Sequence, residues 1–229
     1  MNNEITIILL SHKSKSLVLN FIKDIHIKYK IIIIDNSNDI ELKNIINKNF
    51  PEVSINIIEN NGYGSAINYA SKLVTTKYLI SNPDIIGLNE TNINKFLDAA
   101  KILNDNFSVL GPRFVNANSK SLIQSDNKKK IEEMKFISGS CMFFEKKTFD
   151  FIGGFDEKYF LYFEESDFCL RSHRIRKNYQ INNIKIKHYV GTSVSTSNVY
   201  EKKQLEKLYT WHFIWSKFYY YKKYYTFIL

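Results

Sequence analysis

Three carboxylates follow directly behind an aromatic run in Tyr159–Arg171, which reads YFLYFEESDFCLR. Glu164, Glu165 and Asp167 are costly beside so much apolar surface unless they are paired, hydrated or used in a reaction. If a helix begins near Glu164, Asp167 lies four residues before Arg171 on one face, so the two side chains can form an ion pair. Asp167 therefore has a structural explanation.

Glu165 points about 100° away from that face of the expected helix. Phe168 and Cys169 stand three and four residues further on, where a basic partner would be needed. An unpaired carboxylate in an aromatic setting should have a raised pKa, which suits a general base. The alternative is that these acids only occupy the first turn of a helix, where negative charge is favoured.

Two further acids end predicted strands. Asp35 closes the β-branched run 30–35, where a carboxylate can bind a ribose or a base, although DNSND also fits an Asx turn or a helix N-cap. Asp84 follows the apolar strand 77–81 in SNPDI. One carboxylate together with substrate phosphates can hold Mg²⁺ or Mn²⁺, and an ordinary Asn-Pro-Asp turn is the alternative.

Gly62 and Gly64 stand between a predicted strand and a predicted helix in ENNGYGSAIN. Glycine lets the backbone turn tightly and approach a ligand, and the start of the helix offers N–H groups to a phosphate. The dinucleotide fingerprint requires a third glycine where this chain has Ile67, so a nicotinamide cofactor is not expected. A plain strand-to-helix turn that uses glycine is equally open.

The elements that position these residues alternate between strand and helix in the first half. That order predicts a parallel sheet with helices on both faces and ligands at the carboxyl ends of its strands. We expect strands at 5–10, 30–35, 53–59, 77–81 and 107–111, and helices at 16–29, 40–50, 64–74 and 89–103.

The second half has a different pattern. We expect a polar loop at 119–130, a strand at 134–145 that bends near Gly139, a helix to about Arg176, a strand at 178–189 and a helical, aromatic segment from about 197. No internal repeat is present, and no linker separates a second independent domain.

In this order the motifs resemble those of the inverting glycosyltransferases of family 2, which have the GT-A fold, and in particular a bacterial rhamnosyltransferase-like branch that builds surface polysaccharides. The likeness runs from ITIILLSHKS through IIIIDNSND, ENNGYGSAIN and SNPDI to ISGSCMFFEKKTFDFIGGFDEKYFLYFEESDFCLR and HYVGTS. It covers most of the chain, and the order and spacing of the motifs are specific. It implies an α/β fold with a mostly parallel central sheet flanked by helices.

The resemblance also implies a site for a nucleotide-diphosphate sugar donor. Asp84 falls on the last acid of the family's metal-binding Asp-x-Asp, and Asn82 replaces the first, which leaves one carboxylate for Mg²⁺ or Mn²⁺. His188 matches a family histidine near the diphosphate and the metal, whereas a lone histidine at a strand end is more often structural. The donor-binding residues implied are Ser11, Asp35, Asn61, Gly62, Gly64, Asn82 and Asp84.

In the family, the second acid of the pair behind GGFDE is the catalytic base, so the resemblance implies that role for Glu165, with Glu164 beside it. Gly154, Asp156 and Asp167 would form the acceptor side. The reaction implied is an inverting single displacement. Rhamnose from a thymidine diphosphate donor is the expected sugar, and a glycan or polyprenyl-linked molecule is the expected acceptor.

From this resemblance we expect residues 1–196 to form one GT-A catalytic domain, with a nucleotide-binding half at 1–111 and an acceptor half at 112–196. Residues 197–229 form a helical segment. Of the 25 residues at 205–229, eleven are aromatic and four are lysines. Such a segment fits an anionic membrane surface, because Tyr and Trp favour the headgroup level and lysine attracts anionic lipid. Packing on the core or on a second subunit, as in a homodimer, is the alternative.

Charge and composition limit the classes of binding partner and the cellular location that we expect. The net charge of +9 fits nucleic acid, anionic lipid or a polyphosphate ligand, but no nucleic-acid recognition motif is present, so we expect no nucleic-acid partner. Cys141 and Cys169 lack metal-type spacing and are typical of buried thiols in a reducing compartment. The start of the chain lacks the features of a signal peptide. We expect a cytoplasmic protein, peripheral on the inner face of the cell membrane if the last segment docks there. The alternative function is a non-catalytic transferase-like scaffold that binds membrane or a partner protein.

Overall fold

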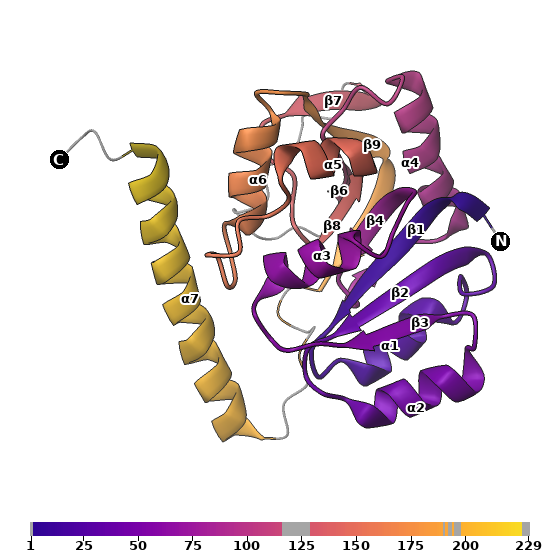
Figure 1. The fold of residues 1–229 in the computed structure, drawn as a ribbon, viewed down its shortest axis with the longest axis vertical. Coiled ribbons are helices and arrows are strands. Elements are labelled where there is room, and N and C mark those ends of the chain that lie inside the picture. Colours follow the sequence, from indigo (N-terminus) through magenta and orange to yellow (C-terminus); the bar gives the residue numbers. More distant parts are fainter. Residues whose placement is uncertain (1, 116–128, 190, 192–193, 195–197, 226–229) are drawn as a thin grey trace.

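The computed structural model describes residues 2–115, 129–189, 191, 194 and 198–225 (Figure 1). Within these residues a nine-stranded sheet has the order β3-β2-β1-β4-β8-β6-β9-β5, with β7 also paired to β9. The strands are β1 Asn2–Ser11, β2 Tyr29–Asp35, β3 Ser54–Ile57, β4 Lys77–Ser81, β5 Ile85–Ile86, β6 Val109–Phe114, β7 Ile131–Met134, β8 Cys141–Phe144 and β9 Asn178–His188. The helices are α1 Lys15–Ile22, α2 Ile40–Asn49, α3 Tyr63–Ser71, α4 Glu90–Ile102, α5 Lys146–Ile152, α6 Glu164–Ser172 and α7 Val199–Tyr225.

The first half of the sheet is parallel, as the alternating pattern predicts. In the centre, Ile8 of β1 pairs with Ile32 of β2 and with Ile80 of β4, and β2 continues in parallel to β3. The carboxyl ends of these strands therefore meet at one edge, where Ser11 lies opposite Asp35. This is the edge at which ligands bind in such sheets.

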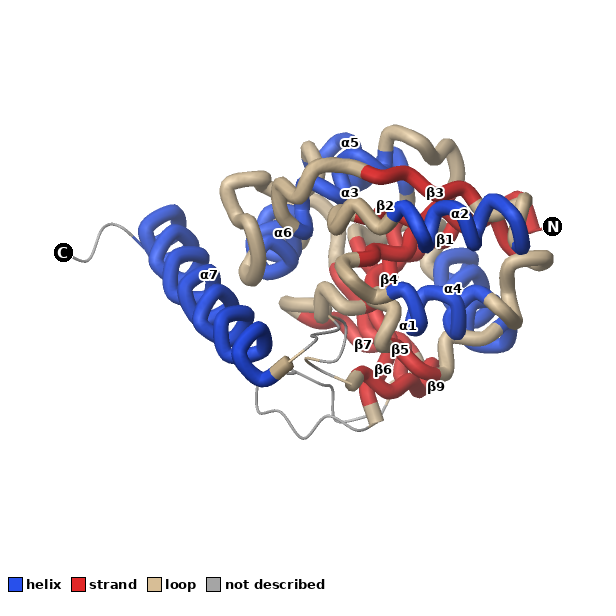
Figure 2. The backbone as a smooth tube through the Cα atoms, turned by 90° about the horizontal axis from the view of Figure 1, so that it is seen from below, coloured by secondary structure: helices blue, strands red, loops and turns tan. Residues whose placement is uncertain are grey.

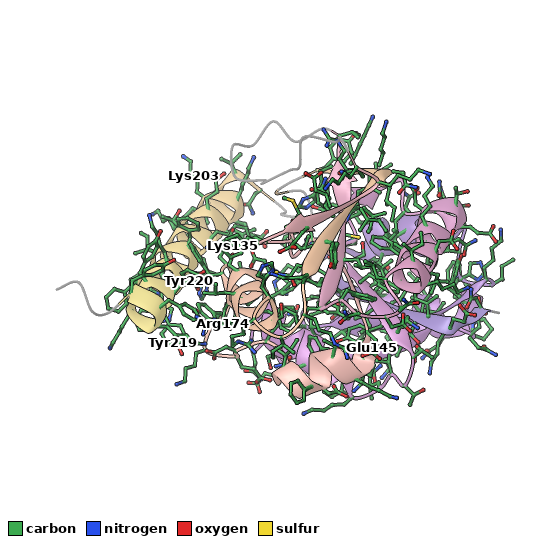
Figure 3. The ribbon with its side chains drawn as sticks, turned by 90° about the horizontal axis from the view of Figure 1, so that it is seen from above. Lys135, Glu145, Arg174, Lys203, Tyr219 and Tyr220 are labelled. Atoms are coloured by element: carbon green, nitrogen blue, oxygen red, sulfur yellow. The ribbon has the colours of Figure 1, made fainter. Side chains whose placement is uncertain are left out.

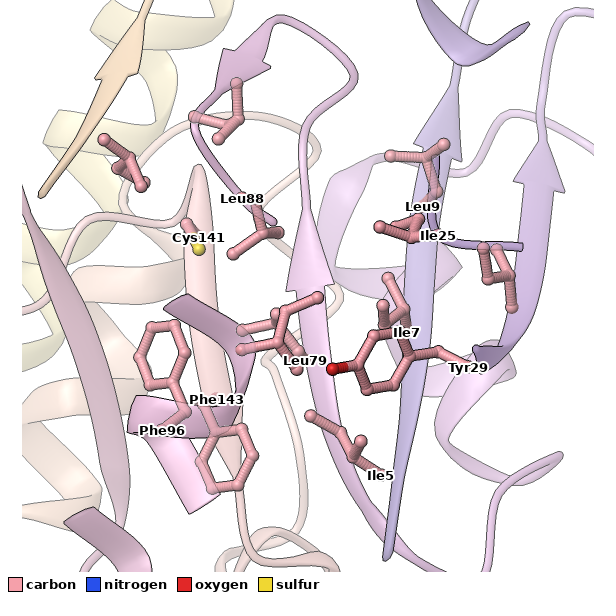
Figure 4. Close-up of a cluster of buried hydrophobic side chains, with 14 of the residues drawn as sticks. Ile5, Ile7, Leu9, Ile25, Tyr29, Leu79, Leu88, Phe96, Cys141 and Phe143 are labelled. Carbon is pink, nitrogen blue, oxygen red and sulfur yellow. The ribbon is translucent and has the colours of Figure 1, made fainter. Parts of the chain in front are cut away.

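Each central strand is buried on both faces, which explains its continuous apolar run. Ile7 of β1 packs into one hydrophobic cluster, with residues of α1, α2 and α4, and Ile8 packs into the other, with residues of α3, α5 and α6. Figure 4 shows the first cluster, where Leu79 lies beside Ile7 and Phe143 beside Phe96. Phe143 and Phe96 stack at 5.5 Å between ring centroids.

The second half differs from the expectation in three places. The expected strand 134–145 is two strands, β7 and β8, separated by the turn around Gly139. Helix α5 was not expected; the side chain of Glu145 caps its start by accepting from Thr148 N at 2.7 Å. Strand β8 runs antiparallel to both β4 and β6, so the sheet is mixed here. Most of the expected loop, 119–128, lies outside the described residues.

Helix α1 ends at Ile22, short of the expected 16–29; turns follow it, and Tyr29 already belongs to β2, where it pairs with Asn2. Helix α7 follows the expected C-terminal segment and has 27 residues. It lies along the end of the molecule farthest from the N-terminus (Figures 1 and 2). Within the described ranges, no helix combines the length and apolar character that crossing a bilayer would need.

Candidate active site

A cavity of about 300 Å³ opens at the carboxyl ends of β1 and β2. One wall comes from the sheet edge and its loops: Leu10, Ser11, His12, Ser14, Asn36, Asn60, Gly62, Tyr63, Asn82, Pro83 and His188. The opposite wall comes from the aromatic run and from α7: Phe160, Leu161, Tyr162, Leu205, Leu208, Tyr209 and His212, with Gly191 and Val194. Of the expected donor residues, Ser11, Gly62 and Asn82 line this cavity.

Three polar side chains along the sheet edge form a chain. His12 Nδ1 lies 2.8 Å from Asn36 Oδ1, and Asn36 Nδ2 donates to Asn60 Oδ1 at 3.0 Å. Next to them, Ser11 is only 2% exposed, and its hydroxyl has no hydrogen-bond partner within the described part of the chain. Buried polar atoms are almost always paired, so the unpaired Ser11 hydroxyl indicates that a bound ligand completes its hydrogen bonding.

Asp35 is fully buried, but its carboxylate serves its own loop. It accepts from the backbone N–H groups of Ser37 and Asp39, each at 3.0 Å, and from the Ser37 hydroxyl. This is the Asx-turn arrangement that the DNSND sequence left open. Asp35 therefore holds the loop in shape, and Asn36 beside it is the residue that reaches the cavity.

The two glycines bring the α3 loop against the aromatic run. Gly62 has φ +97°, and a Cβ there would lie 2.3 Å from the carbonyl oxygen of Phe160, so only glycine fits. Tyr63 N donates to that same oxygen at 2.9 Å, and Gly62 N donates to Asn60 Oδ1 at 3.3 Å. Two of the N–H groups expected to bind a phosphate are thus already used.

Gly64 and Asn61 do not line the cavity. A Cβ on Gly64 would come within 3.0 Å of Phe155 Cβ, so this glycine allows α3 to pack closely. Asn61 is exposed and lies outside the cavity lining. These contacts favour the alternative interpretation, a strand-to-helix turn that uses glycine.

Asp84 and His188 lie together because β5 pairs with the end of β9, with Ile85 opposite His188. His188 Nε2 is 3.3 Å from Asp84 Oδ1. Asp84 is 3% exposed, and among the residues that the structure describes neither of its oxygens accepts a hydrogen bond. A buried carboxylate with unused oxygens beside an imidazole fits a divalent cation. No three such side chains cluster within the described ranges, so donor phosphates and water would supply the other ligands.

Glu164 and Glu165 begin α6, directly behind two non-glycine residues with positive φ, Tyr162 at +69° and Phe163 at +68°. Glu164 is 5% exposed, and its Oε2 lacks a partner within the described part of the chain. Burial, together with the neighbouring charge of Glu165, raises the pKa of Glu164 well above its usual range. Burial also raises the pKa of Glu165, in the direction expected of a general base.

Neither Glu164 nor Glu165 lines the cavity. Tyr63 connects the cavity to the start of α6, where the two glutamates lie. A Cβ on Gly139 would lie 3.3 Å from Glu165 Cβ, so this side chain packs against the Gly139 backbone. The Tyr63 hydroxyl, from the cavity lining, donates to the Gly139 carbonyl oxygen. Glu165 is partly exposed and is therefore accessible from solvent.

The acids expected on the acceptor side contact α7. The predicted ion pair is confirmed, with Arg171 Nε 2.8 Å from Asp167 Oδ2. Lys223 Nζ lies 2.6 Å from Asp167 Oδ1 and 2.7 Å from Asp156 Oδ2. Tyr224 donates its hydroxyl to Asp167 at 2.7 Å. Gly154 accepts through its carbonyl oxygen from Arg171, and its backbone N–H donates to the Phe149 carbonyl oxygen at 3.1 Å. We call the contacts of Asp156 and Asp167 with Lys223 the α7 clasp.

The aromatic run lies between the α3 loop and α7. Phe160 stacks on His212 with 4.3 Å between ring centroids and 16° between planes. The ring centroids of Tyr159 and Tyr219 are 4.8 Å apart; Tyr219 is labelled in Figure 3. The Ser216 hydroxyl donates to the Leu161 carbonyl oxygen at 2.8 Å. One face of α7 therefore packs on the core, as the alternative interpretation of the C-terminal segment expected.

Sequence reasoning missed His12, Asn36, Tyr63 and the α7 side chains of the lining. Asn36 lies inside the DNSND loop that was singled out, so its polar side chain at a strand end was a usable signal. The α7 contribution carries no local signal, because it depends on how a distant helix docks.

A parallel β3-β2-β1-β4 half, an antiparallel β8 and a cavity at the carboxyl strand ends define the GT-A fold of nucleotide-sugar transferases. Solved structures agree. The chain superimposes on TarS of S. aureus in complex with UDP-GlcNAc with a TM-score of 0.63, at 16% identity, over 86% of this chain and 62% of that one. GalNAc-T7 with UDP, GalNAc and Mn²⁺ gives a TM-score of 0.66 at 13% identity, over 85% of this chain and 45% of that one.

By sequence, the chain is 24% identical over 200 residues to the low-salt glycan biosynthesis hexosyltransferase Agl10 of Haloferax volcanii. That match covers 76% of this chain and 63% of the relative, so the chain spans less than two thirds of its length. No protein-family model matches the chain.

Proposed function

We propose that this protein transfers a sugar from a nucleotide-diphosphate donor to a glycan or lipid-linked acceptor in the assembly of a surface polysaccharide. One observation carries the proposal: the Ser11 hydroxyl and both oxygens of Asp84 are buried without hydrogen-bond partners in the described chain, at the ligand-binding edge of the sheet. The likeness to Agl10, a glycan biosynthesis hexosyltransferase, and to TarS with bound UDP-GlcNAc supports it.

The reaction is an inverting single displacement. Glu165 accepts the proton of an acceptor hydroxyl, whose oxygen forms a bond to the anomeric carbon of the donor as the bond from that carbon to the diphosphate oxygen breaks. The nucleoside diphosphate leaves with the bonding electrons. The raised pKa of Glu165 keeps its proton affinity high enough for this role.

Asp84 and His188 would hold Mg²⁺ or Mn²⁺ beside the leaving diphosphate. When bound, such a cation neutralises phosphate charge. Asn82, at the position of the missing first acid, lines the cavity next to them and offers its amide to the donor. The structure of GalNAc-T7 with UDP and Mn²⁺ is consistent with this assignment for a protein of the same fold.

The base of the donor would meet the chain of His12, Asn36 and Asn60, which offers donors and acceptors along the cavity. Rhamnose from a thymidine diphosphate donor is our first candidate, on the resemblance of the motifs. An acceptor linked to a polyprenyl lipid would place the reaction on the inner face of the cell membrane.

The test is nucleoside diphosphate release from a panel of nucleotide sugars with Mn²⁺ or Mg²⁺ and candidate acceptors. We expect release with one donor, and a loss of about 10²–10⁴-fold in kcat for Glu165→Gln with little change in donor binding. Glu157→Gln, at an exposed acid that does not line the cavity, is the control. Absence of release with every donor would favour the scaffold function, and full activity of Glu165→Gln would overturn the assignment of the base.

A further inference from the structure

Helix α7 has two opposite faces. The inner face contacts the body of the protein through His212, Ser216 and Lys223. The other face carries six apolar or aromatic side chains, each three or four residues from another member of the set, that are each between 46% and 61% exposed. We call these residues the outer stripe: Trp211, Ile214, Trp215, Phe218, Tyr221 and Tyr225.

The outer stripe cannot turn inward in the folded protein. Ser216 is fully buried and donates to Leu161 O, and Lys223 is fixed between two carboxylates of the body. With about 100° per residue, Trp215 and Phe218 point to the side opposite these contacts. The stripe is therefore a surface of the docked helix, where a row of large apolar side chains marks an interaction site.

Basic residues share this surface. Lys203, Lys207 and Lys222 are exposed and fall within the arc of the stripe at about 100° per residue. Helix α7 contains two acids. Glu201 is paired with Lys13 of the body at 3.0 Å, and Glu206 projects about 120° away from the middle of the stripe. The outer surface is thus both aromatic and positively charged.

We propose that the outer stripe binds the surface of a lipid bilayer that contains anionic lipid. Tryptophan and tyrosine suit the headgroup level, and the lysines attract anionic headgroups. A second copy of this chain fits less well, because it would bring two sets of the same lysines together. Binding through one face orients α7 along the membrane surface.

Membrane binding by the outer stripe does not depend on the transfer reaction. Its consequence for the reaction is spatial: the inner face of the same helix supplies Leu205, Tyr209 and His212 to the cavity. A bilayer bound to the outer stripe therefore lies one helix diameter from the cavity, about 10 Å. A lipid-linked acceptor could reach the cavity without leaving the membrane.

The chain contains a built-in probe. Trp211 and Trp215 are its only two tryptophans, and both lie in the outer stripe. On adding vesicles of phosphatidylcholine with phosphatidylglycerol to the full chain, we expect a blue shift of tryptophan emission and co-sedimentation of the protein. Phosphatidylcholine vesicles alone should bind more weakly, and added salt should reduce the difference.

Substitutions test the surface directly. The triple variant Trp211→Ser, Trp215→Ser, Phe218→Ser should lose on the order of a hundredfold in partitioning at unchanged melting temperature. The control replaces three apolar residues elsewhere that are each more exposed than those of the triple variant, Ile27→Ser, Ile102→Ser and Phe151→Ser, and should bind like the wild type.

Lys203→Gln with Lys207→Gln and Lys222→Gln should remove the preference for anionic vesicles, about fivefold per lysine. Undiminished binding of the tryptophan variant, or unshifted emission with anionic vesicles, would overturn the proposal. So would a dimer in sedimentation velocity that the stripe substitutions abolish, since that result assigns the surface to a second copy.

Discussion

The ammonium group of Lys223 lies 2.6 Å from the carboxylate of Asp167, a residue that is fully buried beneath α7. The same ammonium group reaches Asp156 at 2.7 Å. These contacts join the last turns of the C-terminal helix to the acidic helix α6 and to the GGF loop before it. Two acids that resemblance assigned to the acceptor are therefore engaged in holding a wall of the cavity in place.

Removal of Lys223 should destabilise the protein. Among the described residues, Lys223→Met leaves the Asp167 carboxylate with Arg171 and Tyr224 as partners, so we expect a loss of about 2–3 kcal/mol in the free energy of unfolding in urea. Lys222→Met is the matched control, because Lys222 is adjacent in the sequence but its side chain points outward. This variant should change the free energy of unfolding by less than about 0.5 kcal/mol. Equal midpoints for the two variants would show that the α7 clasp contributes nothing.

Glu164→Gln should remove a pH dependence of stability. Burial and the charge of Glu165 raise the pKa of Glu164 in the folded protein above its unfolded value. The folded protein thus favours the protonated Glu164 carboxyl. The stability that this proton contributes is fully present below the unfolded pKa and is lost as pH rises through the folded pKa. The neutral amide avoids that loss.

We therefore expect Glu164→Gln to raise stability by about 1–3 kcal/mol at pH 8 and to change it little near pH 4. Melting temperatures across this pH range provide the measurement. Glu59→Gln, at an exposed acid, is the control and should follow the wild type. A wild-type pH slope retained in Glu164→Gln would contradict the raised pKa.

The parts of the fold that sequence predicted are those with a local cause. The strands around Ile8 and Ile33 are buried on both faces, so their continuous apolar runs identify them directly. The ion pair of Asp167 with Arg171 was predictable for the same reason, since it depends only on helical spacing.

The site was harder to predict, because its contacts join distant parts of the chain. Lys223 meets Asp167 across 56 positions, and no local pattern indicates that pairing. Asp35 and Asn36 show a subtler difficulty. Asp35 ends β2 and Asn36 follows it, but the loop uses the Asp35 carboxylate for its own turn, whereas Asn36 lines the cavity.

Asp84→Asn should weaken the cation-dependent part of nucleotide binding. We expect Mn²⁺ to enhance the thermal stabilisation of the wild type by UDP or dTDP, because a ligand that binds the native state raises the melting temperature. Asp84→Asn should lose this enhancement, with Mn²⁺ affinity reduced on the order of 10–100-fold, since Asp84 supplies a carboxylate beside His188.

Asp98→Asn, at an exposed acid of α4, should retain the Mn²⁺ effect. An identical Mn²⁺ effect in both variants would remove Asp84 and His188 as cation ligands, while leaving the assignment of Glu165 intact.

His212→Ala should weaken nucleotide binding through the cavity wall. The His212 ring stacks on Phe160, and the carbonyl oxygen of Phe160 accepts from Tyr63 N in the α3 loop. Burial lowers the pKa of His212, so the ring stacks as neutral imidazole at pH 7. Loss of the stack should cost about 1 kcal/mol, or about fivefold in the affinity for the nucleoside diphosphate measured by calorimetry.

His212→Phe keeps a flat ring at this position and should restore most of that affinity, which separates stacking from any protonic role of the imidazole. Trp211→Ala, one residue earlier on the outer stripe, should leave nucleotide binding unchanged, because its side chain faces away from the cavity. If His212→Ala and Trp211→Ala bound the nucleotide alike, α7 would be a support for the membrane-facing surface alone and not a wall of the donor site.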